Sequence, residues 1–211
     1  YGCNKLQAGL GNLVSAIKYF KNNMVDLRIA LVSAITAMTG AWIGTKIIFL
    51  LPEESIQKAI TVALPVIALI MVLRKTDARN VIMRSEISKK TVVQALIVGV
   101  IMGFYNSLFG PGIGTVAIIA FTMIMHYDAR CASGNGKVLI VLTNAIALVS
   151  YVKTGNVAYE IACPAAICAI AGNLVGVNLA IRKGEKIIKP VMLVVVILTV
   201  IKFAWQNHLW G

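Results

Sequence analysis

Two lysines in this chain lie in apolar segments, and each is followed by the same polar residues at the same spacing. The two sets are Lys5, Asn12 and Tyr19 in the first half and Lys137, Asn144 and Tyr151 in the second. A spacing of seven keeps three side chains on one helix face, with a drift of about 20° per heptad. Because burying an ammonium group is costly without a partner or a substrate, the pattern predicts an anion pathway. A lysine at a membrane edge can also extend into water, and that interpretation is open here.

The second candidate for chemistry is a glycine-rich and proline-containing break. Its relevant residues are Asn106, Ser107, Gly110, Pro111, Gly112 and Gly114. The break interrupts an apolar run over 91–127, which as one helix would be about 55 Å long at 1.5 Å per residue. Since the hydrocarbon core is only about 30 Å thick, the run must break, and the glycines and proline allow it to. Broken helices expose N–H groups that attract anions. Asn106 and Ser107 either bind a substrate or satisfy the broken helix locally.

Composition favours an integral membrane protein and excludes several other classes. Hydrophobic residues make up 59% of the chain and charged residues 13%. The net charge of +12 comes from basic residues between apolar spans, which fits the positive-inside rule better than nucleic-acid binding. We find no catalytic triad, phosphate loop or metal-ligand cluster, so we expect no enzyme activity, metal or cofactor. The four cysteines, Cys3, Cys131, Cys163 and Cys168, are interpreted as small buried thiols.

The hydropathy pattern predicts an all-α, polytopic membrane bundle. The expected helices cover 4–20, 27–51, 56–73, 91–109, 113–125, 137–151, 157–181 and 187–205. The segment 74–90 is basic, and we expect it in the cytoplasm. The positive-inside rule then favours a hairpin over 91–125 rather than one span, because the hairpin places more of the basic residues on the same side.

An internal repeat appears when the chain is shifted by 132 residues. The matched pairs are Lys5 with Lys137, Asn12 with Asn144, Tyr19 with Tyr151, Gly40 with Gly172 and Gly44 with Gly176. The glycine pairs predict close helix packing. We therefore divide the chain into an incomplete first repeat (1–73), a basic loop (74–90) and a second repeat (91–211). The first-half counterpart of 91–125 would comprise roughly 35 to 45 residues before Tyr1. Repeats that enter the membrane from opposite sides are typical of secondary transporters.

The motifs also resemble a known family. The segment 103–114 is similar to the pattern G-F-Y-D-G-x-x-G-P-G-x-G of TauE/SafE (TSUP) membrane transporters, which are grouped with sulfite and sulfonate exporters. Arg130 to Lys137, Asn144 and the start Asn4-Lys5-Leu6-Gln7 fit further segments of that family. The chain departs from the family at three positions, with Asn106 for Asp, Ser107 for Gly and Ile140 for Asn. The resemblance implies a polytopic transporter of small anions or sulfur-containing organic compounds, with a first broken helix before Tyr1.

Together these features predict a multi-pass cell-membrane transporter of small anions, such as sulfur oxyanions, sulfonates or related organic acids. Its partners would be the anion and the lipid bilayer, and homo-oligomers are possible. We expect both lysines to face one common cavity beside the glycine-rich break, and transport by alternating access of two repeats. A passive anion channel and a membrane scaffold without transport are the alternatives.

Overall fold

The described part of the protein, taken from a computed structural model, is helical, as the hydropathy pattern predicts. Its helices are α1 (Gly2–Lys21), α2 (Leu27–Leu50), α4 (Lys89–Leu108), α5 (Ile113–Met123), α6 (Ala129–Lys153) and α7 (Tyr159–Lys183). The structure describes residues 2–50, 52, 55, 88–108, 112–155, 157–184, 186–188, 190, 191, 193, 194, 197, 198, 201 and 205. The helix predicted over 56–73 lies outside these residues. The described positions between 187 and 205 are helical.

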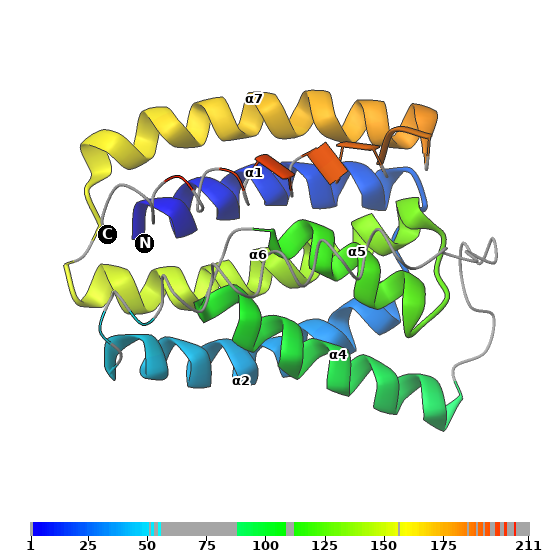
Figure 1. The fold of residues 1–211 in the computed structure, drawn as a ribbon, viewed down its shortest axis with the longest axis horizontal. Helices are drawn as coiled ribbons and strands as arrows, with labels where there is room; N and C mark the ends of the chain where they lie inside the picture. The colour runs from blue at the N-terminus through cyan, green and yellow to red at the C-terminus, as the bar shows by residue number, and fades with distance from the viewer. Residues whose placement is uncertain are drawn as a thin grey trace.

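The long helices run side by side along the long axis of the molecule (Figure 1). Within the described residues, four stretches are long and apolar enough to cross a membrane: Leu27–Ile47, Lys89–Leu108, Ala129–Lys153 and Tyr159–Lys183. α1 has 20 residues, enough for about 30 Å, but its polar side chains keep it out of this group. The fold class of an all-α membrane protein is confirmed for the described part, whereas the repeat symmetry stays a prediction.

The glycine-rich break is present between α4 and α5. α4 ends at Leu108, and α5 begins at Ile113 after Gly112. Gly112 has φ 77°, in the left-handed region that favours glycine. The start of α4 and the end of α5 lie at the same end of the bundle (Figure 1). This arrangement is the predicted hairpin, but α5 has 11 residues, about 16 Å, so its second arm covers only half a bilayer.

The start of α6 differs from the sequence prediction, which placed it at Lys137. The helix begins eight residues earlier, at Ala129. The side chain of Asp128 accepts a hydrogen bond from the backbone N–H of Arg130 at 3.1 Å, which caps the helix N-terminus. Gly134 and Gly136 are therefore helical residues. Their missing side chains allow close approach, because a methyl group on Gly136 would lie 2.9 Å from Cβ of Ala117.

α2 and α4 pack backbone against backbone through small residues. On α2 the contact is made by Gly40 and Gly44, which we call the α2 seam. A methyl group on Gly44 would lie 2.9 Å from Cβ of Ser107 and 3.0 Å from the carbonyl oxygen of Phe104. α4 contributes Gly103, which lies against the backbone of Ala37. The predicted close packing of this glycine pair is confirmed, and it is the geometry by which membrane helices associate without a hydrophobic driving force.

The matching pair on α7, Gly172 and Gly176, behaves differently. For this α7 seam the prediction of close packing is wrong over the described residues, since a methyl group on either glycine would meet no atom within 4 Å. α7 instead approaches α1 through Ala169 and Asn173. A methyl group on Gly11 of α1 would lie 2.6 Å from Nδ2 of Asn173. The α7 seam borders open space beside this contact.

None of the four cysteines forms a disulfide, and not all of them are buried. Cys131 is buried and Cys3 is half-buried, whereas Cys163 and Cys168 are exposed on α7. The interpretation as buried thiols is therefore wrong for these two. Only 11% of the most apolar part of α7 is buried inside the protein, so an apolar residue on this helix is more often on the outer surface than in the core.

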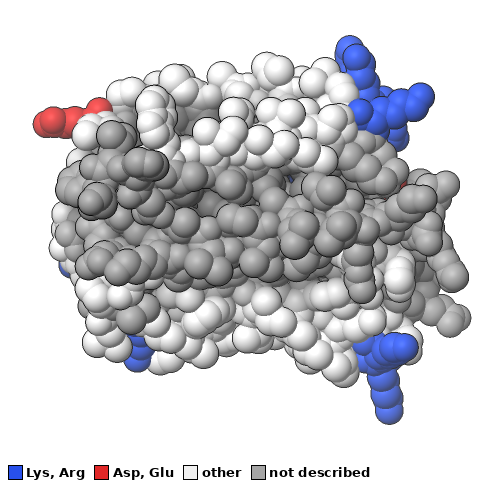
Figure 2. Space-filling view, viewed as in Figure 1, with Lys and Arg blue, Asp and Glu red and all other residues white. Residues whose placement is uncertain are grey.

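Basic side chains gather at the two corners of one end of the molecule, on the right in Figure 2. The helix termini at that end carry Lys18, Lys21, Lys89, Lys90, Arg182 and Lys183. Such an asymmetry is the pattern that the positive-inside rule associates with the cytoplasmic side.

Candidate functional site

Lys5 is a buried lysine in the interior of the bundle. Its side chain is 2% exposed, and its ammonium nitrogen donates to the backbone carbonyl oxygen of Asn106 at 2.6 Å. That carbonyl belongs to the last turn of α4, where backbone acceptors lack partners within the helix. The contact therefore joins α1 to the end of α4, immediately before the break.

The side chain of Asn106 continues this contact into α6. Its amide nitrogen donates to Oγ1 of Thr143 at 2.7 Å and to Oδ1 of Asn144 at 3.0 Å. All three side chains are buried, and Thr143 also donates to carbonyl oxygens of its own helix. Lys5, Asn106 and Asn144, which lie far apart in the sequence, thus form one connected polar group.

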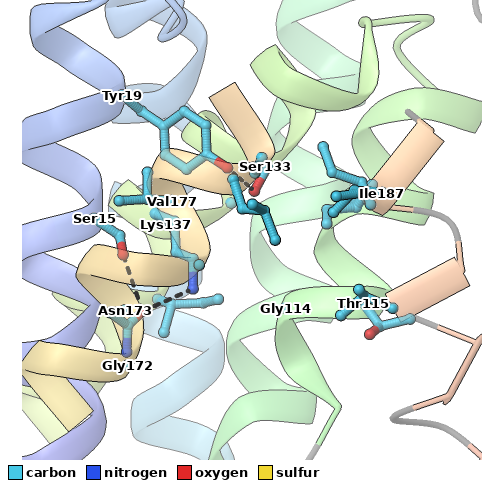
Figure 3. Close-up of a pocket in the computed structure, with 18 residues that line it drawn as sticks. Ser15, Tyr19, Gly114, Thr115, Ser133, Lys137, Gly172, Asn173, Val177 and Ile187 are labelled. Atoms are coloured by element: carbon cyan, nitrogen blue, oxygen red, sulfur yellow. Dashed lines mark hydrogen bonds between the residues drawn. The ribbon is translucent and has the colours of Figure 1, made fainter. Parts of the chain in front are cut away.

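Lys137 on α6 belongs to a second polar group, whose other members lie on α1 and α7. Its ammonium nitrogen donates to Oδ1 of Asn12 at 2.6 Å and to Oδ1 of Asn173 at 3.4 Å. Ser15 donates to the same oxygen of Asn173 at 2.9 Å (Figure 3). Asn12 uses its amide nitrogen to donate to the carbonyl oxygen of Ala8, at 2.6 Å. Three helices therefore meet at the Lys137 ammonium group.

Three cavities lie along these polar groups. We name each after a residue that lines that cavity and neither of the other two. The Tyr19 cavity, about 350 Å³, is bordered by α1, α5, α6 and α7 (Figure 3). The Gln7 cavity has about 540 Å³, and the Lys5 cavity about 240 Å³.

The three cavities adjoin one another because they share lining residues. The Tyr19 and Gln7 cavities share Gly114, Lys137, Ile140 and Asn173. The Gln7 and Lys5 cavities share Ala8, Asn12, Ile113 and Ile140. The prediction that both lysines face one common cavity is therefore wrong. Lys5 lines the Lys5 cavity, Lys137 lines the other two, and Asn12 lines both the Gln7 and Lys5 cavities.

The charge in this region is unbalanced. Among the described residues, the linings of the three cavities contain the two lysines and no carboxylate. The hydrogen-bond acceptors of both lysines are neutral amide or backbone oxygens. The buried acid Asp26 lines none of the cavities, and its Oδ2 accepts from the hydroxyl group of Tyr127 at 2.6 Å. Two ammonium groups with neutral partners favour the entry of an anion.

The start of α5 adds backbone donors to the same place. The Gln7 cavity is lined by Gly112, Ile113 and Gly114. The N-cap residue is Gly112, which has no side chain that could cap the helix. The first N–H groups of a helix lack partners within the helix and carry its positive dipole end. A methyl group on Gly114 would meet no atom of the described residues within 4 Å, and Gly114 lines the cavity.

The structure brings most of the sequence-predicted site residues together. Those that line the three cavities are Lys5, Asn12, Asn106, Gly112, Gly114, Lys137 and Asn144. Ser107 lines none of them, because its hydroxyl group donates to the carbonyl oxygen of Ala41 at 2.9 Å and belongs to the contact with α2. Gly110 and Pro111 lie outside the described residues.

Sequence reasoning missed Asn173, the shared acceptor of Ser15 and Lys137. Two features of the sequence point to Asn173 and Ser15. Asn173 is an amide within an apolar span, and Ser15 follows Asn12 by three residues, which places both on one helix face. Asn173 has no counterpart at the repeat offset, because Ala41 occupies that position. A search based on the repeat alone therefore passes over it.

Comparison with known proteins identifies the family. A model of the family described as "Sulfite exporter TauE/SafE" matches residues 1–203. The chain belongs to the TauE/SafE family. This TauE/SafE protein is 27% identical over 201 residues to a "Probable membrane transporter protein ORF9" of Sinorhizobium sp, covering 95% of this chain and 76% of that protein. It is 22% identical over 205 residues to the "Probable membrane transporter protein YfcA" of Escherichia coli K12, covering 97% and 75%.

A further relative of the TauE/SafE protein is a "Probable membrane transporter protein" of Haemophilus influenzae, 22% identical over 209 residues, which are 98% of this chain and 80% of that protein. No solved structure matches the chain. The family and the relatives establish the TauE/SafE protein as a membrane transport protein, and the four apolar helices found among the described residues agree with this.

Proposed function

We propose that this protein is a secondary transporter of small anions and that the anion binds in the Gln7 and Lys5 cavities. The observation that carries the proposal is the pair of lysines in adjoining cavities with neutral partners and no lining carboxylate among the described residues. Lys137 and Lys5 supply the charge. Asn106 and Asn144 supply neutral hydrogen bonds, the N-terminus of α5 supplies backbone donors, and Asn12 lines both cavities.

The substrate class follows from size and charge. Sulfur oxyanions, sulfonates and small carboxylates carry several acceptor oxygens on a compact anion, which match two ammonium groups and a helix N-terminus. The name of the family model, which refers to sulfite export, points in the same direction. We infer that the basic end of the bundle faces the cytoplasm and that two repeats alternate access to the site.

The proposal is tested by sulfite flux into liposomes that contain the purified protein. Lys137→Met and Lys5→Met should each lower the flux at least about tenfold, because each removes a charge-assisted hydrogen bond to the anion. Lys153→Met is the matched control, since Lys153 is an exposed lysine on the same helix as Lys137. Its flux should equal that of the unmodified protein.

Two other results are informative. Unchanged flux in both cavity variants would exclude the lysines from transport. Flux that never saturates with sulfite concentration, and that no second anion inhibits, would favour a passive channel.

A further inference from the structure

The Gln7 and Lys5 cavities share four lining residues, of which Asn12 is the one with a polar side chain. The Asn12 side chain is half-buried. Both ends of its amide group are engaged, because Oδ1 accepts from Lys137 at 2.6 Å and Nδ2 donates to Ala8 at 2.6 Å. In this arrangement the amide group of Asn12 occupies the position at the Lys137 ammonium group that an anion would take.

An anion is a stronger acceptor for an ammonium group than a neutral amide oxygen is. Charge-assisted hydrogen bonds are shorter and roughly twice as strong as neutral ones. The second acceptor, Asn173, is farther from Lys137, at 3.4 Å, and Ser15 already donates to it. An anion that reaches Lys137 therefore competes mainly with Asn12.

The bond between Asn12 and Lys137 also joins α1 to α6, which belong to different predicted repeats. Lys5 makes a similar connection from α1 to α4. Losing the first bond leaves the Asn12 side chain held only by its donation to Ala8, and it removes one link that resists movement of α1 against α6.

We propose that Asn12 is a gate between the Gln7 and Lys5 cavities, closed by its bond to Lys137 and opened when an anion takes its place. The gate rests on the proposed anion transport. It predicts that the anion is transferred from Lys137 to Lys5 and that an empty site keeps the passage closed.

The experiment measures sulfite binding to the purified protein by equilibrium dialysis, and sulfite and chloride flux in liposomes. Asn12→Ala removes the competing acceptor, so sulfite should bind several-fold more tightly and chloride should leak through the open passage. Asn12→Asp places a carboxylate on Lys137 with almost unchanged shape, and sulfite binding should weaken by about tenfold or more. A purely structural role would weaken binding in both variants.

Asn22 provides matched controls, because it lines none of the three cavities. It is exposed in the turn after α1, and its amide nitrogen donates to the carbonyl oxygen of Lys18 at 2.7 Å, as that of Asn12 donates to Ala8. Asn22→Ala and Asn22→Asp should both leave sulfite binding and chloride exclusion unchanged.

The outcomes separate the gate from the transport proposal. Absence of sulfite binding and flux in the unmodified protein would overturn the proposed transport of this anion, and with it the gate. If the unmodified protein binds and transports sulfite, then unchanged or weaker binding in Asn12→Ala overturns the gate alone. If Asn12→Ala fails to fold, binding in Asn12→Asp as tight as in the unmodified protein has the same meaning.

Discussion

The α2 and α7 seams have the same sequence pattern and different surroundings. Gly40 and Gly44 on α2 lie at the same repeat offset as Gly172 and Gly176 on α7. The α2 seam is pressed against the backbone of α4, whereas the α7 seam has no described atom within 4 Å of an added methyl group. The most apolar parts of the two helices are correspondingly 44% and 11% buried.

The difference shows that a Gly-x-x-x-Gly pattern allows close helix packing but does not produce it alone. A second helix must present a matching surface. α4 fits the α2 seam because it presents glycines of its own, Gly99 and Gly103, toward α2. Small residues on both helices bring the backbones together. Substitutions at the two seams therefore measure how much stability the packing against a neighbouring helix adds.

The largest effect is expected for Gly103→Ala on α4. The new methyl group would lie 2.7 Å from both the carbonyl carbon and Cα of Ala37, and it would also meet the Ala37 carbonyl oxygen. Backbone atoms cannot rotate away, so α2 and α4 must separate. We expect a loss of about 3 kcal/mol in the free energy of unfolding, measured by denaturant titration in detergent. A loss below about 1 kcal/mol would mean that the two backbones adjust easily. Close packing at the α2 seam would then contribute little to stability.

A smaller loss is expected for Gly40→Ala on α2. The methyl group would meet the carbonyl oxygen of Val100 and would lie 3.0 Å from the backbone nitrogen of Phe104. It would press on two positions of α4, and we expect a loss of about 2 kcal/mol in the same titration. The matched control is Gly172→Ala, which makes the same change at the same repeat position. Equal losses in the two variants would contradict the contrast between the seams.

The sequence predicted the elements well where a local signal determines them. α1, α2, α4 and α7 begin and end within two residues of their predicted bounds. The break was predictable because an apolar run longer than a bilayer must bend at its glycines. The start of α6 was not, because the cap at Asp128 outweighed the two helix-disfavouring glycines that follow.

The site was predictable in its residue types and less so in its connections. The repeat led to Lys5, Asn12, Lys137 and Asn144, and all four line the cavities. Asn173 was missed because it lacks a counterpart at the repeat offset. The sequence gives no means to tell which oxygen each lysine bonds, since the acceptors lie on three different helices and their positions depend on tertiary packing.

The lysine pair provides a second contrast between the two halves. Lys5→Ala leaves the carbonyl oxygen of Asn106 buried without its side-chain donor, and we expect a loss of about 1.5 kcal/mol in unfolding free energy. Lys137→Ala frees Oδ1 of Asn12 beside a cavity of about 540 Å³, where water can replace the lost donor. The loss there should stay below about 0.5 kcal/mol. A larger loss for Lys137→Ala than for Lys5→Ala would reverse the order that burial predicts.

The only gain in stability is expected for Gly172→Ala on α7. Alanine in a helix is more favourable than glycine by up to about 1 kcal/mol, because glycine loses more backbone freedom on folding. The added methyl group meets no described atom, so we expect a gain of about 0.5 kcal/mol, and Gly176→Ala should behave alike. A loss comparable to that of Gly40→Ala would instead show that a neighbouring backbone contacts the α7 seam in the membrane. The two seams would then be equivalent in packing as well as in sequence.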